Sequence, residues 1–277
     1  MSADKTSEDL QALTQATQDI WNQNAPWWDE KIGEGNQFQR ILLGPAIERL
    51  LEMHSGKIVL DVGCGNGVFA RRLAQLGAEV VACDFSEKFL ERAKARTTEL
   101  VEHIEYRLID VTNYEQMMTL GKRRFDAAVC NMALMDMTTI NSLLSALSQL
   151  LKVGGSFIFS VCHPCFNTNG CKMLVEEEDR DGELITTYAV KVSKYLRLLP
   201  TKGLGIIGQP APHYYFHRPI SLLFNSCFSV GFVLDGIEEP AFNQDTNADR
   251  PFEWANYKDI PPVLVARMRL IRSDIFC

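Results

Sequence analysis

Val59-Leu60-Asp61-Val62-Gly63-Cys64-Gly65-Asn66-Gly67 joins a short apolar run to a helical pattern that begins at Val68. Glycines at 63, 65 and 67 let the backbone approach a ligand closely, and the Asp61 carboxylate suits a cationic amino-acid group better than a phosphate. A dinucleotide fingerprint would require glycine at position 68, which is valine here. The segment therefore predicts a strand, a ligand-binding loop and a helix, with a ligand other than a pyrophosphate.

The same alternation of strand and helix continues along the chain. Apolar runs at 79–83, 104–109, 125–130 and 156–161 are separated by helical patterns, and two more strands are predicted at 232–237 and 263–270. Strands separated by helices of this length pair in parallel, with right-handed crossovers and helices on both faces. We therefore predict an α/β fold with a doubly wound, mostly parallel seven-stranded sheet in one structural domain.

Two segments fall outside this alternation. Residues 1–53 are predicted to be helices that form a lid, interrupted at Asn24-Ala25-Pro26, where tryptophans either pin the helices to the core or cover a ligand. Residues 164–218 are rich in glycine and proline and predict an insertion that covers the substrate, with a solvated turn at the acidic run 176–181. The ligand-binding core is then 54–163 together with 219–277.

Acidic residues follow the first three predicted strands. Asp84 lies at the end of the second strand and Asp110 at the end of the third, so that both are expected near Asp61 at the crevice where open α/β sheets bind ligands. An acid at a strand end can also simply cap the next helix. The glycine spacing and these acids resemble the motifs of class I S-adenosylmethionine-dependent methyltransferases of the small-molecule type, over residues 55 to 165.

This resemblance implies a Rossmann-like methyltransferase fold with S-adenosylmethionine as cofactor and S-adenosylhomocysteine as product. In the family, the acid at Asp84 binds the ribose hydroxyls and the position of Asp110 contacts the adenine. The cofactor-binding residues implied in this chain are Asp61, Gly63, Cys64, Gly65, Asn66, Gly67, Asp84, Phe85, Asp110, Val111 and Asn131.

Methyl transfer from a sulfonium is an in-line displacement that needs alignment of donor and acceptor, but no metal. A general base is needed only where the acceptor must lose a proton. We identify His163, directly after the fifth strand, and His217 as catalytic candidates, although each could instead hold a loop. Trp28, Met132, Met135 and Tyr215 are candidates for the wall of the acceptor pocket, and such residues are also common in cores.

Composition limits the partners that we expect. The chain has 277 residues, a net charge of −7 and no apolar run long enough to span a bilayer, so we expect a cytoplasmic protein that binds neither membranes nor nucleic acids. Its eight cysteines resemble buried apolar residues of a reducing compartment. The expected partner is a small-molecule acceptor, by preference one methylated on oxygen or nitrogen; the sequence gives no indication of oligomeric state.

Several alternatives remain open from the sequence. A nicotinamide-dependent oxidoreductase shares the fold and the ribose-binding acid, although the glycine spacing disfavours it. Cys162-His163-Pro164-Cys165 could belong to a zinc or redox site, but no second cysteine pair accompanies it. Carbon methylation and a noncatalytic scaffold are further possibilities. Methylation of nucleic-acid amino groups is disfavoured because Asn131-Met132-Ala133-Leu134 lacks the two prolines and aromatic residue of those enzymes.

Overall fold

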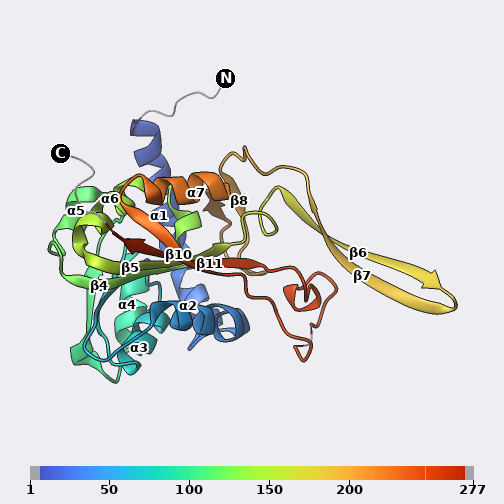
Figure 1. Ribbon diagram of the computed structural model, residues 1–277, viewed down its shortest axis with the longest axis horizontal. Helices are drawn as coiled ribbons and strands as arrows, with labels where there is room; N and C mark the ends of the chain where they lie inside the picture. Colours follow the sequence, from blue (N-terminus) through green and yellow to red (C-terminus); the bar gives the residue numbers. More distant parts are fainter. Residues whose placement is uncertain (1–6, 247, 272–277) are drawn as a thin grey trace.

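A single seven-stranded sheet forms the centre of the molecule in the computed structural model, which describes residues 7–246 and 248–271 (Figure 1). Its strands run in the order β10-β11-β5-β4-β1-β2-β3. The bounds are β1 Ile58–Val62, β2 Glu79–Asp84, β3 Ile104–Leu108, β4 Phe125–Asn131, β5 Leu151–Cys162, β10 Phe232–Glu238 and β11 Val263–Leu270. Strands β1 to β5 pair in parallel, and β11 pairs antiparallel with both β5 and β10. The predicted doubly wound, mostly parallel sheet is confirmed.

Helices cover both faces of this sheet. They are α1 Ser7–Ile32, η1 Phe38–Leu43, α2 Gly44–Leu51, α3 Val68–Gln75, α4 Glu87–Arg96, η2 Val101–His103, α5 Tyr114–Met118, η3 Leu134–Asp136, α6 Asn141–Leu150, α7 Ile220–Phe228 and η4 Trp254–Asn256. Leu60 of β1 packs in one apolar cluster with α6 and α7, whereas Val59 packs in a second cluster with α2 and α3. Successive strand residues point to opposite faces, so a sheet buried on both sides needs this continuous apolar run.

The N-terminal helix differs from the prediction. We expected a break at Asn24-Ala25-Pro26, but α1 continues through Pro26 to Ile32. Proline inside a helix removes one backbone hydrogen bond, and tertiary contacts compensate for that loss here. The Asn24 side chain exchanges two hydrogen bonds with the backbone of Ala211, at 2.8 and 3.0 Å, and Ala25 is fully buried.

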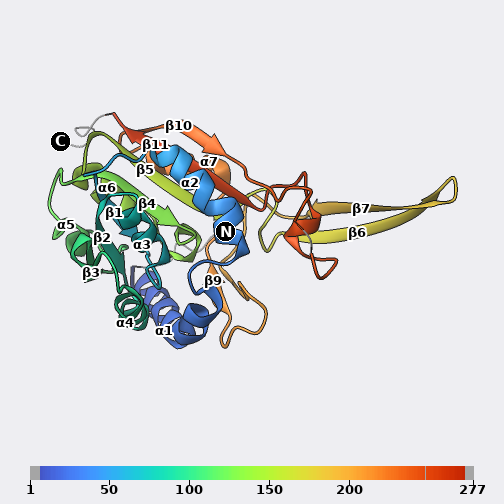
Figure 2. The same ribbon diagram turned by 90° about the horizontal axis from the view of Figure 1, so that it is seen from below.

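The insertion after β5 contains two separate hairpins. Strands β6 Cys171–Arg180 and β7 Glu183–Val192 form a long ribbon that projects from the body, whereas β8 Thr201–Gly203 pairs with β9 His213–Tyr215 near α1 (Figures 1 and 2). The acidic run was expected to be a turn, but residues 176–180 belong to β6. The turn itself is Asp181-Gly182, where both residues have a positive φ, as tight hairpin turns require.

Candidate functional site

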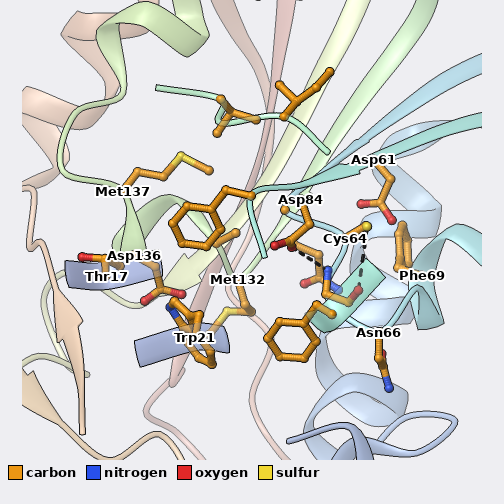
Figure 3. A pocket seen from close by; sticks show the side chains of 18 of the residues that line it. Thr17, Trp21, Asp61, Cys64, Asn66, Phe69, Asp84, Met132, Asp136 and Met137 are labelled. Atoms are coloured by element: carbon orange, nitrogen blue, oxygen red, sulfur yellow. Dashed lines mark hydrogen bonds between the residues drawn. The ribbon is translucent and has the colours of Figure 1, made fainter. Parts of the chain in front are cut away.

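A cavity opens at the carboxyl ends of β1, β2 and β4, where the strand order reverses between β1 and β4 (Figure 3). The predicted residues that line it are Asp61, Gly63, Cys64, Gly65, Asn66, Asp84, Phe85, Asp110, Val111 and Asn131. Gly67 does not line it. The space, including the part open to solvent, is about 1120 Å³, which is large for a single small ligand. The topology therefore brings one loop and several strand ends to one cavity.

Two buried carboxylates lie at the centre of this cavity. Asp84 receives a hydrogen bond from the Gly65 N–H at Oδ2 (2.9 Å) and another from the Ser86 N–H at Oδ1 (2.8 Å). Asp61 is 1% exposed, and its Oδ2 has no hydrogen-bond partner among the described residues. Burial raises the pKa of Asp84 to about 6; burial and the nearby Asp84 charge raise that of Asp61 to about 7. A cationic ligand would supply the partner that Asp61 lacks.

We predict that cofactor affinity depends on pH through Asp61. A cation binds the ionised carboxylate, so ligand binding must release a proton from Asp61 below its pKa of about 7. Affinity should fall by up to about tenfold per pH unit below pH 7, before Asp84 also titrates near pH 6. Calorimetric titration with S-adenosylhomocysteine between pH 6 and 9 measures this slope. An equal slope in the Asp61→Asn variant would contradict the assignment.

The three positions of the loop are occupied by glycine for different physical reasons. Gly63 has a φ of +68°, and a Cβ there would lie 2.7 Å from the Ala133 Cβ. Gly67 has a φ of +75°, and a Cβ there would lie 2.5 Å from the Tyr106 hydroxyl oxygen, so it is required for packing. Gly65 has a φ of +55° and open space in front of it, although it lines the cavity. Only at Gly65 would a side chain enter the ligand space directly.

Helix α1 is fastened across the ends of the loops that form the cavity. Asn22 Oδ1 accepts a hydrogen bond from the Ser86 hydroxyl (2.7 Å) beyond β2, and Asp29 Oδ1 accepts one from Asn66 Nδ2 (3.1 Å) after β1. Arg96 of α4 also forms an ion pair with Asp29. Thr14, Thr17, Trp21, Trp28 and Ile32 of α1 line the cavity. The helix thus forms one wall of the site.

The residues predicted to bind the acceptor separate into two groups. Trp28 and Met132 line the cavity described above, whereas Met135, Tyr215 and His217 line a neighbouring cavity under the insertion. Met132 has a φ of +57°, which is uncommon for a residue with a side chain and is found at functional sites. The structure therefore does not bring the predicted acceptor wall together at one place.

His163 lines neither cavity and is 1% exposed. Its Nδ1 accepts a hydrogen bond from the Cys165 N–H (3.1 Å), so Nε2 carries the proton and donates to Glu239 (2.8 Å). Both ring nitrogens are therefore occupied. The geometry favours the second of its two possible roles, in which the ring holds a loop.

For the His163→Gln variant we expect turnover to stay within about twofold, while the loss of buried hydrogen bonds lowers the free energy of unfolding by about 1–3 kcal/mol. Chemical denaturation and methyl-transfer assays measure the two quantities. A large fall in turnover with unchanged stability would restore His163 as the base.

The side chains of His217 and Arg218 also donate hydrogen bonds to backbone carbonyl groups. His217 Nε2 donates to the Tyr195 carbonyl (2.7 Å), and the Arg218 guanidinium donates to the carbonyls of Leu134 (2.9 Å) and Met137 (2.7 Å). Burial lowers the pKa of Arg218 to about 10. Arg218 therefore fixes the segment after β4 that forms part of the cavity wall, and His217 fixes the insertion at Tyr195.

Two residues that the sequence analysis missed are Asp136, at the cavity wall, and His213, which is buried beside it and is not among the residues that line the cavity. Asp136, in η3, lines the cavity, and His213 Nε2 lies 3.8 Å from its Oδ1. His213 also stacks on Trp21, with 4.5 Å between the ring centroids. The signal in the sequence was the run of polar and aromatic residues before Pro219, which contains His213 as well as His217.

The cysteines give no geometric sign of a zinc or redox site. All seven within the described ranges are unpaired, and burial raises the pKa of Cys162 to about 12, against thiolate formation. Within the same ranges, no group of three or more His, Cys, Asp or Glu side chains is arranged to hold a metal ion. None of the helices that the structure describes is long and apolar enough to cross a bilayer.

Comparisons with known proteins agree with this geometry. Residues 60–159 match a family described as a methyltransferase domain. The ubiquinone biosynthesis O-methyltransferase of Nitrosomonas europaea is 30% identical over 228 residues, which cover 79% of this chain and 83% of the relative. The protein of that name from Bordetella avium is 33% identical over 141 residues. The chain spans only about half the length of two such ubiquinone biosynthesis O-methyltransferases, 56% of the one from Bordetella avium and 53% of the one from Alkalilimnicola ehrlichii.

A solved structure extends the comparison. The S-adenosylmethionine-dependent methyltransferase from Mesorhizobium loti is 27% identical, with a TM-score of 0.64, and covers 81% of this chain and 96% of its own. Fold and site together define an α/β protein with a ligand cavity at the switch point of its sheet. The chain belongs to the class I S-adenosylmethionine-dependent methyltransferases. Its cofactor is therefore S-adenosylmethionine.

Proposed function

We propose that the protein transfers the methyl group of S-adenosylmethionine to an oxygen or nitrogen of a small molecule. The observation that carries this proposal is the single cavity in which the buried Asp61 and Asp84 carboxylates lie beside apolar and aromatic walls. Relatives named for O-methylation in ubiquinone biosynthesis support an oxygen acceptor. The unpaired cysteines of the described ranges suit a reducing compartment, and we place the activity in the cytoplasm.

The residues present fit the cofactor. The partnerless Oδ2 of Asp61 suits the amino group, and Asp84 has acceptor oxygens for the ribose hydroxyls. Phe85 and Val111 offer apolar surface for the base, and the Thr112 N–H and hydroxyl both donate to Oδ1 of Asp110 at 2.9 and 2.8 Å, which fixes that side chain at the wall. Bound there, the cofactor supplies an electrophilic methyl group. The protein itself contributes alignment and exclusion of water.

We propose that α1 and the β8–β9 part of the insertion cover the acceptor. Trp28 of α1 donates from Nε1 to Gln209 Oε1 (3.2 Å), and Asn24 bonds the backbone of Ala211. These contacts close the cavity on the side away from the sheet. A macromolecular substrate would have to displace them, which favours a small acceptor.

Methyl transfer from labelled cofactor into a fractionated metabolite extract tests the proposal. We expect label in the low-molecular-weight fraction together with one equivalent of S-adenosylhomocysteine. The nicotinamide alternative is tested on the same preparation by calorimetry with NAD. Absence of transfer combined with NAD binding, and no binding of S-adenosylhomocysteine, would overturn the proposal.

A further inference from the structure

Two buried side-chain oxygens lack hydrogen-bond partners among the described residues: Asp61 Oδ2 and Asp136 Oδ1. The cofactor cation accounts for the first. Asp136 lies beside Trp21 and apart from Asp61 in Figure 3, so it needs a different partner. A buried carboxylate oxygen without a partner costs free energy, and because the Asp136 residue lines the ligand cavity, we expect its side chain to meet the ligand.

The hydrogen bonds of Gln209 fix the proton on the neighbouring His213. Gln209 Oε1 accepts from the Gly205 N–H (3.1 Å) and the Trp28 indole N–H (3.2 Å), which are both obligate donors. The amide nitrogen of Gln209 must therefore donate to His213 Nδ1, 2.9 Å away. With Nδ1 an acceptor, neutral His213 carries its proton on Nε2, the atom closest to Asp136.

His213 stays neutral in this environment. The ring is 3% exposed and is packed between Trp21 and Tyr215, with centroid distances of 4.5 and 4.4 Å. Burial lowers its pKa to about 4. A neutral ring whose Nδ1 is already occupied is a hydrogen-bond donor at Nε2, on the side of Asp136, and a poor proton acceptor.

The segment that carries Asp136 is rigidly held. The Arg218 guanidinium donates to the carbonyls of Leu134 and Met137, which lie before and after Asp136 in the chain. The Phe216 N–H donates to the Met135 carbonyl (2.7 Å). The 3.8 Å between Asp136 Oδ1 and His213 Nε2 is too long for a direct hydrogen bond. The pair is therefore preorganised to receive an atom that bonds to both.

We propose that Asp136 and His213 bind the acceptor as an aromatic hydroxyl group, with Asp136 as the proton acceptor and Gln209 as the residue that positions His213. A hydroxyl group donates one hydrogen bond and accepts others, so it satisfies both partners. An amine attacks through its single lone pair and has none left to accept from His213. This inference rests on the proposed function and specifies its acceptor.

The walls favour an aromatic acceptor. Trp21, Met132 and Met137 lie on the side of the cavity where Asp136 lies (Figure 3), and they offer an aromatic face for stacking and sulfur atoms for contacts. Phe89 also lines the cavity. Burial and the charge of Asp84 raise the pKa of Asp136, and an ionised carboxylate substrate would be repelled by the Asp84 carboxylate. A phenolic hydroxyl, with a pKa near 10, is also far easier for a carboxylate to deprotonate than an aliphatic hydroxyl.

The proton and electrons balance in this step. The acceptor oxygen forms a C–O bond to the methyl carbon while its proton passes to Asp136 Oδ1. The C–S bond breaks, and its electron pair stays on sulfur, which becomes the neutral thioether of S-adenosylhomocysteine. Asp136 ends as the neutral acid and returns its proton to water when the products leave.

The first test determines the chemical class of the product. Labelled product from the metabolite extract is treated with dilute alkali, which hydrolyses methyl esters, and then with hydriodic acid, which converts methyl ethers to volatile methyl iodide. We expect label that resists alkali, is released by hydriodic acid and comes from a compound with aromatic absorbance. An ester, a methylamine or an aliphatic ether would overturn the inference but leave the proposed function standing. A C-methyl product, or no labelled product at all, would overturn both.

The second test removes the proton acceptor. We expect Asp136→Asn to lower turnover in the same assay by about 100- to 10,000-fold, the range for loss of a general base, with affinity for S-adenosylhomocysteine within about twofold of wild type. Asp126→Asn is the control, because it makes the same change of side chain at the opposite end of β4, where Asp126 accepts the Ile58 N–H at 2.9 Å. Undiminished turnover in Asp136→Asn would overturn the role of Asp136.

The third test concerns Gln209, whose effect is indirect. A glutamate at this position has no N–H, so its carboxylate would accept from His213 Nδ1 and move the ring proton away from Nε2. Nitrogen-15 NMR of labelled histidines should show the Nε2–H tautomer of His213 in the wild type and its loss in Gln209→Glu. His163, also an Nε2–H tautomer, is the reference within each spectrum. Turnover should fall about tenfold; an unchanged tautomer, or a changed tautomer with full turnover, would refute the positioning role.

Discussion

Replacement of Asp84 by asparagine is expected to weaken S-adenosylmethionine binding about 10- to 100-fold, since hydrogen bonds to a charged group contribute about 1.5–3 kcal/mol. The carboxylate holds the Gly65 and Ser86 N–H groups with one oxygen each, and asparagine has only one acceptor oxygen for the two. The variant therefore loses the negative charge beside a cationic ligand and loosens the glycine loop. Calorimetric titration with S-adenosylmethionine at pH 8 measures the loss.

Asp126→Asn provides the comparison for this variant as well. Asp126 accepts the Ile58 N–H and pairs with Lys152 at 2.6 Å, at the end of the sheet remote from the cavity. Its replacement should leave the cofactor affinity unchanged. If Asp84→Asn bound the cofactor as tightly as this control does, the assignment of Asp84 to the ribose would be wrong.

A leucine at Gly65 is expected to reduce cofactor affinity by at least about 10- to 100-fold, because its side chain would occupy the ligand space. Gly65 lines the cavity with a φ of +55°, and no atom lies within 4 Å of the position that a Cβ would take. The same φ region disfavours leucine and should cost about 1–2 kcal/mol of stability. Loss of binding should therefore exceed what the loss of stability explains.

Gly182→Leu separates the two effects. Gly182 also has a positive φ, +86°, with open space in front of it, but it lies in the turn of the projecting β6–β7 hairpin. Both variants should lose similar stability in chemical denaturation, and only Gly65→Leu should lose cofactor binding. Equal affinities in the two variants would show that the ligand does not approach Gly65.

Local patterns were sufficient to predict the sheet and the residues at the strand ends. The apolar run before Asp61, the alternate glycines and the acid at Asp84 are consecutive or regularly spaced, so they report the backbone and its burial directly. Parallel strands end at the same edge, and this rule alone placed Asp61 and Asp84 in one cavity. The class of cofactor was implied by the resemblance to a known family that the same residues carry.

Long-range packing decided the acceptor side of the site. No spacing rule connects Asp136 with His213, because they meet only when β9 packs against η3 beside α1. Contacts from outside the local sequence likewise occupied both nitrogens of His163 and kept α1 helical through Pro26. The sequence by itself determined the sheet and the cofactor loop, since these depend on neighbouring residues. Tertiary structure alone decided which buried carboxylate and histidine face each other, because that depends on how distant segments pack.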